Sequence, residues 1–217
     1  MVHGKYLCSS WQAFVQQLMS NLSHGYYYYH YYMLPEKRRI KLPQIDKIIC
    51  TLFETDKSKD KRYHQRKAGK ANYFYLRYDL MVAILRSEGT ETDEKRLEQQ
   101  FKDIRKEPLE IRLMGGEVVL KLHKSVAKGL TIHFTKDCYR ELKAKFMELL
   151  EKRQIEQVKY WFNALNGIPA YSGINDHKRM LLKDILKTAR KHRIALKRAD
   201  FRLFPKRKVY KVFENED

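Results

Sequence analysis

Features that define several common protein classes are scarce in this chain of 217 residues. It has three cysteines, Cys8, Cys50 and Cys138, which lie far apart and form no CxxC pair. This spacing argues against a disulfide framework and a zinc ribbon, and favours a reducing compartment. No stretch approaches 18 uninterrupted apolar residues, and the first residues lack the apolar core of a secretion signal. We therefore expect a cytoplasmic or nucleoid-associated protein with no membrane partner.

The motifs of common enzyme classes are also missing. The chain contains no GxxxxGK[ST], GxGxxG or GxSxG sequence and no acidic cluster suited to two-metal nuclease chemistry. Its histidines are scattered and form neither HxH nor HExxH. The sequence therefore predicts no metal site and no cofactor.

Acidic residues are few relative to basic ones. The chain has 45 Lys and Arg against 26 Asp and Glu, a formal net charge of +19, and a pI near 9.7. Two segments carry nearly all of this excess: Lys57–Lys70 with seven basic residues and one acid, and Lys178–Lys211 with fourteen basic residues and two acids. One interpretation is two solvated faces of ordinary lysine-rich helices. The clustering favours another, a pair of surfaces that neutralise phosphates and release counterions.

The residues expected to contact phosphates come from these two segments and from two short stretches beside them. In the first half of the chain they are Arg38, Arg39, Lys59, Lys61, Arg62, Arg66, Lys67, Lys70 and Arg77. In the second half they are Lys183, Lys187, Arg190, Lys191, Arg207 and Lys208. On a helix, Lys183, Lys187, Arg190 and Lys191 share one side, opposite an apolar set. Such contacts position a protein on nucleic acid without specifying a sequence.

Aromatic residues are abundant and concentrated in two β-rich runs, Tyr26–Leu34 and Tyr73–Leu85. Burying every tyrosine hydroxyl of the first run would require a partner for each, because an unpaired buried hydroxyl costs about 1–3 kcal/mol. We therefore expect one accessible face, on which bases could stack. The expected stacking residues are Tyr28, Tyr32, Tyr73 and Tyr75. The alternative is an amphipathic sheet that packs on helices, with its hydroxyls at the rim.

Catalysis by histidine and tyrosine side chains is an alternative function. Metal-independent phosphodiester cleavage needs a general acid, a general base and cations on the scissile phosphate. The candidates are His30 with a neighbouring tyrosine, and His133 with Tyr139. A lone histidine on an apolar strand is more often a core residue, so these assignments are the weaker hypothesis.

The order of elements predicts an α+β fold with helices packed on one mostly antiparallel sheet. The main signals are a helix capped by Ser10, a helix opened by Pro43, a hairpin at Gly115-Gly116, and a long helical region capped by Thr135. Residues 1–165 are expected to form the body and 166–175 a linker. Residues 176–217 would form a basic helix capped by Asp176 and a hairpin tail.

Three segments carry a resemblance to known proteins. Leu34–Arg39, Ile45–Ile49 and Arg66–Tyr78 resemble segments of small, basic, functionally undefined accessory proteins of bacterial mobile elements. The resemblance implies a genomic setting. It implies no reaction and assigns no catalytic residue.

Three functions follow as expectations. The first is a nucleic-acid-binding accessory protein, for DNA or RNA, with phosphate contacts from the basic segments and stacking by tyrosines. The second is a metal-independent nuclease or strand-processing enzyme. The third is a structural subunit of a larger nucleoprotein complex.

Overall fold

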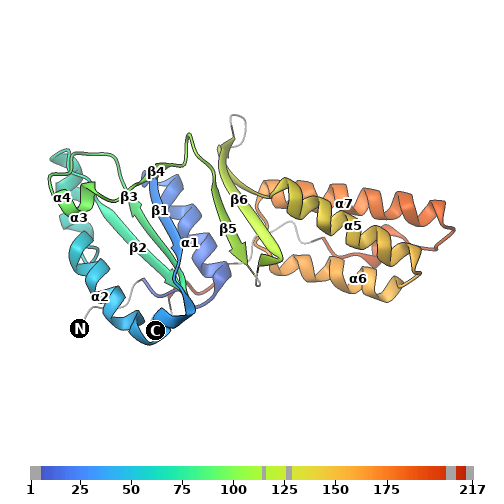
Figure 1. Ribbon diagram of the computed structural model, residues 1–217. Coiled ribbons are helices and arrows are strands. Elements are labelled where there is room, and N and C mark those ends of the chain that lie inside the picture. The colour runs from blue at the N-terminus through green and yellow to red at the C-terminus, as the bar shows by residue number, and fades with distance from the viewer. Residues whose placement is uncertain (1–5, 114–115, 126–128, 204–208, 214–217) are drawn as a thin grey trace. The chain divides into compact units, whose positions relative to one another are not determined.

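The computed structural model describes residues 6–113, 116–125, 129–203 and 209–213 and has an α+β fold. The chain divides into two compact units (Figure 1). The first unit comprises residues 1–107 and 210–217, and the second comprises residues 108–209. This division differs from the predicted one, because residues 166–175 lie inside the second unit, where they include the start of a long helix.

The first unit is built from a sheet, four α-helices and a 3-10 helix. Its helices are α1 (Trp11–Ser23), η1 (Glu36–Lys41), α2 (Leu42–Phe53), α3 (Lys59–Lys67) and α4 (Glu94–Leu97). Its strands are β1 (Tyr28–Met33), β2 (Tyr73–Tyr78), β3 (Met81–Arg86) and β4 (Lys102–Asp103). The β-rich run from Tyr73 is a hairpin of two strands, and Asp79 takes a positive φ of 47° at its turn.

The strands of this sheet run in the order β2-β3-β1-β4, all antiparallel. The two aromatic strands β1 and β2 are therefore not neighbours, since β3 lies between them. The register aligns Tyr28 with Arg86 and Arg86 with Tyr73, so these three side chains lie on one face. Tyr29 and Tyr31 lie on the other.

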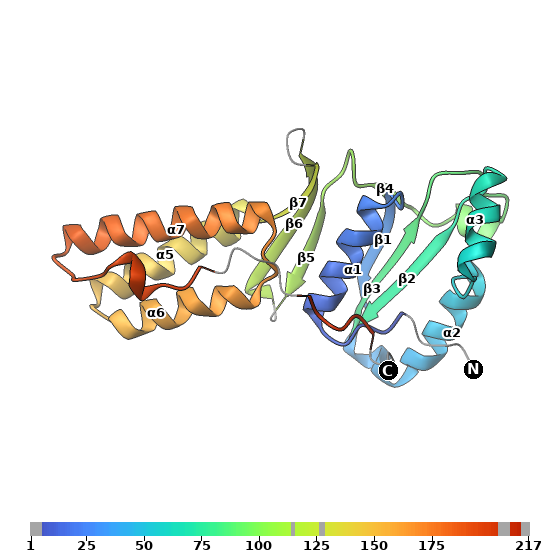
Figure 2. The ribbon, with the colours of Figure 1, turned by 180° about the vertical axis from the view of Figure 1, so that it is seen from behind.

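Helices cover both faces of the sheet (Figures 1 and 2). On one face, Ile49, Cys50 and Phe53 of α2 form a buried cluster with Tyr73, Tyr75, Val82 and Ile84. On the other, the ring of Phe14 in α1 lies 6.5 Å from that of Tyr31. This double coverage explains how so many aromatic residues are accommodated in one sheet.

The second unit combines a three-stranded sheet with three long helices. Its strands are β5 (Leu109–Leu113), β6 (Val118–Ser125) and β7 (Gly129–Phe134). Its helices are α5 (Lys136–Glu151), α6 (Ile155–Ala164), η3 (Leu165–Gly167), α7 (Ser172–Lys191) and η4 (Arg198–Asp200). The sheet order is β5-β6-β7, antiparallel throughout, so the described residues form two sheets rather than the single sheet predicted.

Several local predictions are confirmed. Ser10 caps α1 by accepting a hydrogen bond from the Ala13 amide, and Thr135 caps α5 by accepting one from the Cys138 amide. Strands β5 and β6 pair across the predicted Gly-Gly turn, of which Gly116 is described. The predicted long helical region is interrupted between α5 and α6, where Arg153 takes a positive φ of 53°.

Two predictions near the C-terminus differ from the structure. Helix α7 begins at Ser172 rather than after Asp176, because Gly173 and Ile174 are buried and continue the helix backward into the predicted loop. In the tail, residues 201–203 and 209–213 do not pair with each other as a hairpin. Phe213 instead forms an antiparallel bridge with Cys8. Residues 204–208, including Arg207 and Lys208, lie outside the described residues.

Among the helices described, none has both the length and the apolar character needed to cross a lipid bilayer.

Candidate functional site

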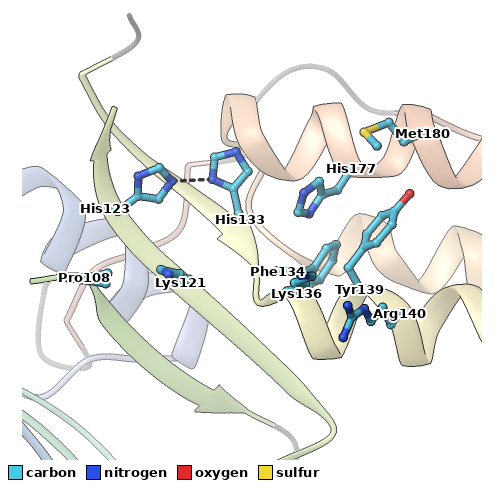
Figure 3. A pocket seen from close by; sticks show the side chains of 10 residues that line it. All are labelled: Pro108, Lys121, His123, His133, Phe134, Lys136, Tyr139, Arg140, His177 and Met180. Atoms are coloured by element: carbon cyan, nitrogen blue, oxygen red, sulfur yellow. Dashed lines mark hydrogen bonds between the residues drawn. The ribbon is translucent and has the colours of Figure 1, made fainter. Parts of the chain in front are cut away.

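The second unit contains a cavity of about 650 Å³ between its sheet and its helices (Figure 3). Strands β6 and β7, helix α5 and helix α7 supply nearly all of its lining. The lining residues are Pro108, Lys121, His123, His133, Phe134, Lys136, Tyr139, Arg140, His177 and Met180. A cavity of this size is in the range of small-molecule binding sites.

The pairing of β6 with β7 brings two histidines together on one face of the sheet. The register places Lys121 opposite His133, and His123 is two residues further along β6. His123 Nε2 and His133 Nδ1 share a hydrogen bond of 2.8 Å, and their rings are stacked at a centroid separation of 4.9 Å. One of these nitrogens donates and the other accepts, so only one of the two carries a proton at this contact.

The first turns of α5 supply the second wall. Lys136, Tyr139 and Arg140 have i, i+3, i+4 spacing, which places them on one side of the helix. The Thr135 cap starts the helix directly after β7, so these side chains follow closely on His133 and Phe134. The junction of β7 with α5 thus supplies five of the lining residues.

Helix α7 closes the cavity with His177 and Met180. Figure 3 shows the His177 ring between those of His133 and Tyr139; the centroid separations are 5.1 Å and 4.7 Å. The His177 ring is also nearly parallel to that of Phe134, at 10° and 5.9 Å. Burial lowers the pKa of His177, with Asp176 opposing, so the imidazole is neutral at pH 7.

Two residues that line the cavity each have a polar atom that is buried without a hydrogen-bond partner. These atoms are Tyr139 Oη and His177 Nδ1. Burial also raises the pKa of the Tyr139 hydroxyl, which keeps its proton. A buried polar atom with no partner costs about 1–3 kcal/mol. The hydroxyl group and the imidazole nitrogen are thus unpaired, but both atoms are closed off from the cavity itself.

The charge of the lining is of one sign. Lys121, Lys136 and Arg140 contribute three cations, and no carboxylate lines the cavity. Arg140 contacts Asp137 at 3.3 Å, but both side chains are largely exposed and such a pair is weak. Lys121 and Lys136 form no ion pair with the residues that the structure describes. The cavity thus favours an anion over a cation.

Metal binding has no structural support in the described part of the chain. Within it, no group of three or more His, Cys, Asp or Glu residues is arranged to hold an ion. The three histidines of the cavity form a row, in which His123 stacks on His133 and His177 is tilted against His133, and no carboxylate or thiolate lines the cavity to complete a coordination shell.

The basic residues predicted on α7 lie on its exposed side. Lys183, Lys187, Arg190 and Lys191 are all exposed, while Leu181, Leu182 and Ile185 are buried. None of the four basic residues forms an ion pair with any residue in the described ranges. Lys178, which is also in the basic segment, is instead 1% exposed.

The basic residues of the first unit divide into two groups. The exposed group comprises residues on or directly after α3 and one residue on η1: Lys59, Lys61, Arg66, Lys67, Lys70 and Arg38.

The other predicted basic residues of the first unit form contacts within the protein. Arg39 is paired with Glu36 and Asp79, and Arg62 donates to the Thr55 carbonyl at 2.7 Å. Arg77 is buried and bonded to Asp46, so the prediction that it contacts phosphate is wrong for this fold.

The predicted stacking face is wrong for β2. Tyr73 is 4% exposed and Tyr75 is 1% exposed, because α2 packs over them. Tyr28 and Tyr32 are half-buried. Tyr28 has the guanidinium groups of Arg86 and Arg105 within 5.6 Å of its ring centre, and the ring of Tyr32 packs edge-on against His30. The alternative interpretation, an aromatic sheet that packs on helices, describes these residues better.

The structure separates the catalytic candidates. His30 lies in the first unit, where its Nδ1 contacts the Gln100 carbonyl at 3.1 Å. His133 and Tyr139 both line the cavity of the second unit. The sequence interpretation missed His123 and His177 as members of this group. Alternation along the β6–β7 hairpin could have indicated His123, but the position of His177 depends on how α7 packs.

No known protein family, curated protein or solved structure matches this chain.

Proposed function

We propose that this protein binds nucleic acid through the phosphate backbone and acts as an accessory factor rather than as a sequence reader. The observation that carries the proposal is the row of exposed basic residues on α7, which have no acidic partner among the described residues. A surface cation that is already paired gains little from a phosphate, whereas an unpaired one releases counterions when it binds. The exposed cations of α3 support the same function from the first unit.

The experiment compares two variants with the same reduction in charge. In the first, Lys183, Lys187 and Arg190, all unpaired, are replaced by alanine. In the control, Lys152, Lys159 and Arg179 are replaced; these residues of the same unit are paired with Glu148, Glu156 and Asp176. Binding of labelled single- and double-stranded DNA and RNA is measured from about 50 to 300 mM salt, a range over which affinity for a phosphate backbone usually falls by orders of magnitude.

The first variant should bind about tenfold more weakly or worse, for all sequences alike. The slope of its salt dependence should fall by roughly one unit for each phosphate that the protein no longer neutralises. The control should stay close to the unmodified protein. Equal weakening in the two variants would mean that net charge alone drives binding. If the affinity of the unmodified protein for nucleic acid did not change with salt concentration, the proposal would be wrong.

A second candidate is metal-independent phosphodiester cleavage, favoured by the meeting of His133 and Tyr139 with His177 and three cations in one cavity. Its test is cleavage of labelled strands in the presence of EDTA. Activity that disappears in His177→Ala while strand binding persists would support an enzyme. Absence of cleavage with all four types of strand would exclude it.

The mobile-element setting and membership of a larger nucleoprotein complex stay predictions. Identifying the nucleic acid and the proteins that co-purify with the chain tests both.

A further inference from the structure

We propose that the cavity of the second unit binds a nucleoside phosphomonoester, with the phosphate between the cations of β6 and α5 and the base against the aromatic wall. This site is distinct from the α7 surface of the proposed function. The ligand chemistry has two possible sources, a free nucleotide or the phosphorylated end of a strand; only the second rests on the proposed function.

The charge of the cavity lining favours a phosphate group. Lys121 approaches the cavity from β6, while Lys136 and Arg140 approach from the first turns of α5 (Figure 3). A phosphomonoester carries nearly two negative charges near pH 7, and a carboxylate only one. Three cations without a lining carboxylate match the more highly charged group. The guanidinium of Arg140 can bind two phosphate oxygens at once.

The evidence for a base comes from the aromatic rings of β7, α5 and α7 that line the cavity. The His177 ring centre lies 4.7 Å from that of Tyr139 and 5.9 Å from that of Phe134. Phe134 is buried, so the half-buried rings of Tyr139 and His177 provide the accessible aromatic surface. Aromatic faces of this kind stack with any nucleobase. The hydroxyl of Tyr139 and Nδ1 of His177 are closed off from the cavity, so the rings rather than these two atoms form the contact surface for a base. An inorganic anion would make no contact of this kind with the rings.

The backbone of the site supports this arrangement. Gly173 of α7 lies against His133, since a Cβ at this position would come within 2.5 Å of the Ile132 carbonyl oxygen and would overlap the His133 ring. The Gly173 amide donates to Thr131 Oγ1 at 3.3 Å, and the Thr131 and Ser172 hydroxyls share a hydrogen bond of 2.9 Å. The close approach of α7 to β7 thus holds the histidine row in place before any ligand binds.

The experiment titrates the full chain with adenosine 5′-monophosphate, adenosine and inorganic phosphate, followed by calorimetry and by the histidine ring signals in NMR. Adenosine 5′-monophosphate should bind at least tenfold more tightly than either fragment and shift the signals of His123, His133 and His177. Equal binding of adenosine and its monophosphate would show that the cations do not bind the phosphate group. Equal binding of inorganic phosphate and the nucleotide would show that the rings do not bind the base.

A double variant, Lys136→Gln with Arg140→Gln, should weaken the nucleotide at least tenfold. Both residues are exposed, so the fold should persist. The control is Lys152→Gln with Lys159→Gln, which removes the same charge outside the cavity and should bind the nucleotide as the unmodified protein does. Unchanged binding in the Lys136 and Arg140 variant would overturn the site.

Two tetranucleotides, one with a 5′-phosphate and one with a 5′-hydroxyl, distinguish the sources. Tighter binding of the phosphorylated strand than of the free nucleotide identifies strand ends as the ligand. Equal binding of the two strands, with the free nucleotide tighter than both, identifies a free nucleotide. The α7 alanine variant should keep nucleotide binding while it binds long strands more weakly. Failure of the proposed function can therefore be distinguished from failure of this site.

Discussion

Arg77 binds Asp46 through two parallel hydrogen bonds inside the first unit. Its Nε donates to Oδ1 and its Nη2 to Oδ2, each at 2.8 Å, and Tyr75 Oη donates to the same Oδ1 at 2.6 Å. Asp46 lies on α2, and Arg77 and Tyr75 lie on β2. The carboxylate therefore ties the helix to the sheet at a point where both charged partners are buried.

The first prediction concerns this pair. Asp46→Asn should destabilise the first unit by about 3–5 kcal/mol, because it leaves the buried guanidinium of Arg77 without its countercharge. The chain has two tryptophans, Trp11 in the first unit and Trp161 in the second, so a Trp161→Phe background lets Trp11 fluorescence report urea unfolding of the first unit alone.

The matched control is Asp79→Asn, which removes the partner of an exposed ion pair with Arg39. Exposed pairs contribute about 0.2–1 kcal/mol, and asparagine tolerates the positive φ of this position. If Asp46→Asn costs no more than Asp79→Asn, the buried pair does not stabilise the unit.

The second prediction concerns Lys178, which is 1% exposed and pairs with no acid among the described residues. Burial lowers its pKa from 10.5 to about 8, a difference on the order of 3 kcal/mol. Below pH 8 the amine is charged in both folded and unfolded chains, and the full cost of its burial is present. Between pH 8 and 10.5 the unfolded chain binds a proton that the folded chain has released, so this contribution to stability rises with pH.

Lys178→Met should therefore stabilise the second unit at pH 7, and its advantage should shrink as pH approaches 10. Trp161 fluorescence in a Trp11→Phe background measures the unfolding. Burial raises the pKa of Tyr139 in the same unit above its ordinary value of 10, which opposes this trend above pH 10 and limits the comparison to about pH 7–9.5. Lys183→Met, exposed on the same helix, is the control; an equal effect in both would show that Lys178 bears no burial cost.

The third prediction concerns Gly173. Helix propensity favours alanine over glycine, but a Cβ here would overlap the His133 ring and approach the Ile132 carbonyl oxygen to 2.5 Å. Gly173→Ala should destabilise the second unit by about 1–3 kcal/mol, the usual range for overpacking. It should also shift the His133 ring signals in NMR.

Gly167→Ala serves as the comparison. A Cβ at Gly167 meets no atom within 4 Å, so alanine there should be neutral or slightly stabilising. A Gly173→Ala protein as stable as Gly167→Ala, with unchanged His133 signals, would contradict the close packing of α7 against β7.

Short-range patterns predicted much of the local structure. Ser10 and Thr135 start helices because their side chains accept amide hydrogen bonds three residues onward, which is a local interaction. The pairing of β5 with β6 across Gly115-Gly116 is equally local. The start of α7 was missed because the burial of Gly173 and Ile174, rather than a capping side chain, extends the helix.

The aromatic strands show what such short-range patterns cannot predict. Alternation correctly divided Tyr28, His30 and Tyr32 from Tyr29 and Tyr31, but it could not show that α1 and α2 cover both faces or that β3 separates β1 from β2. Tyr73 and Tyr75 were therefore expected at the surface and are buried. The partner of Arg77, Asp46, lies 31 residues earlier in the chain, with nothing local to indicate it.

What the sequence by itself determined is the α+β class, the placement of most helices and strands, and the concentration of positive charge in two segments. These follow from propensity, capping and periodicity, which act over a few residues. Only the tertiary structure decided which cations stay exposed, as on α7, and which are buried, as Arg77 and Lys178 are. It also decided that His123, His133, Tyr139 and His177 share one cavity. Both outcomes depend on contacts between segments tens of residues apart, and no local pattern encodes the packing that brings those segments together.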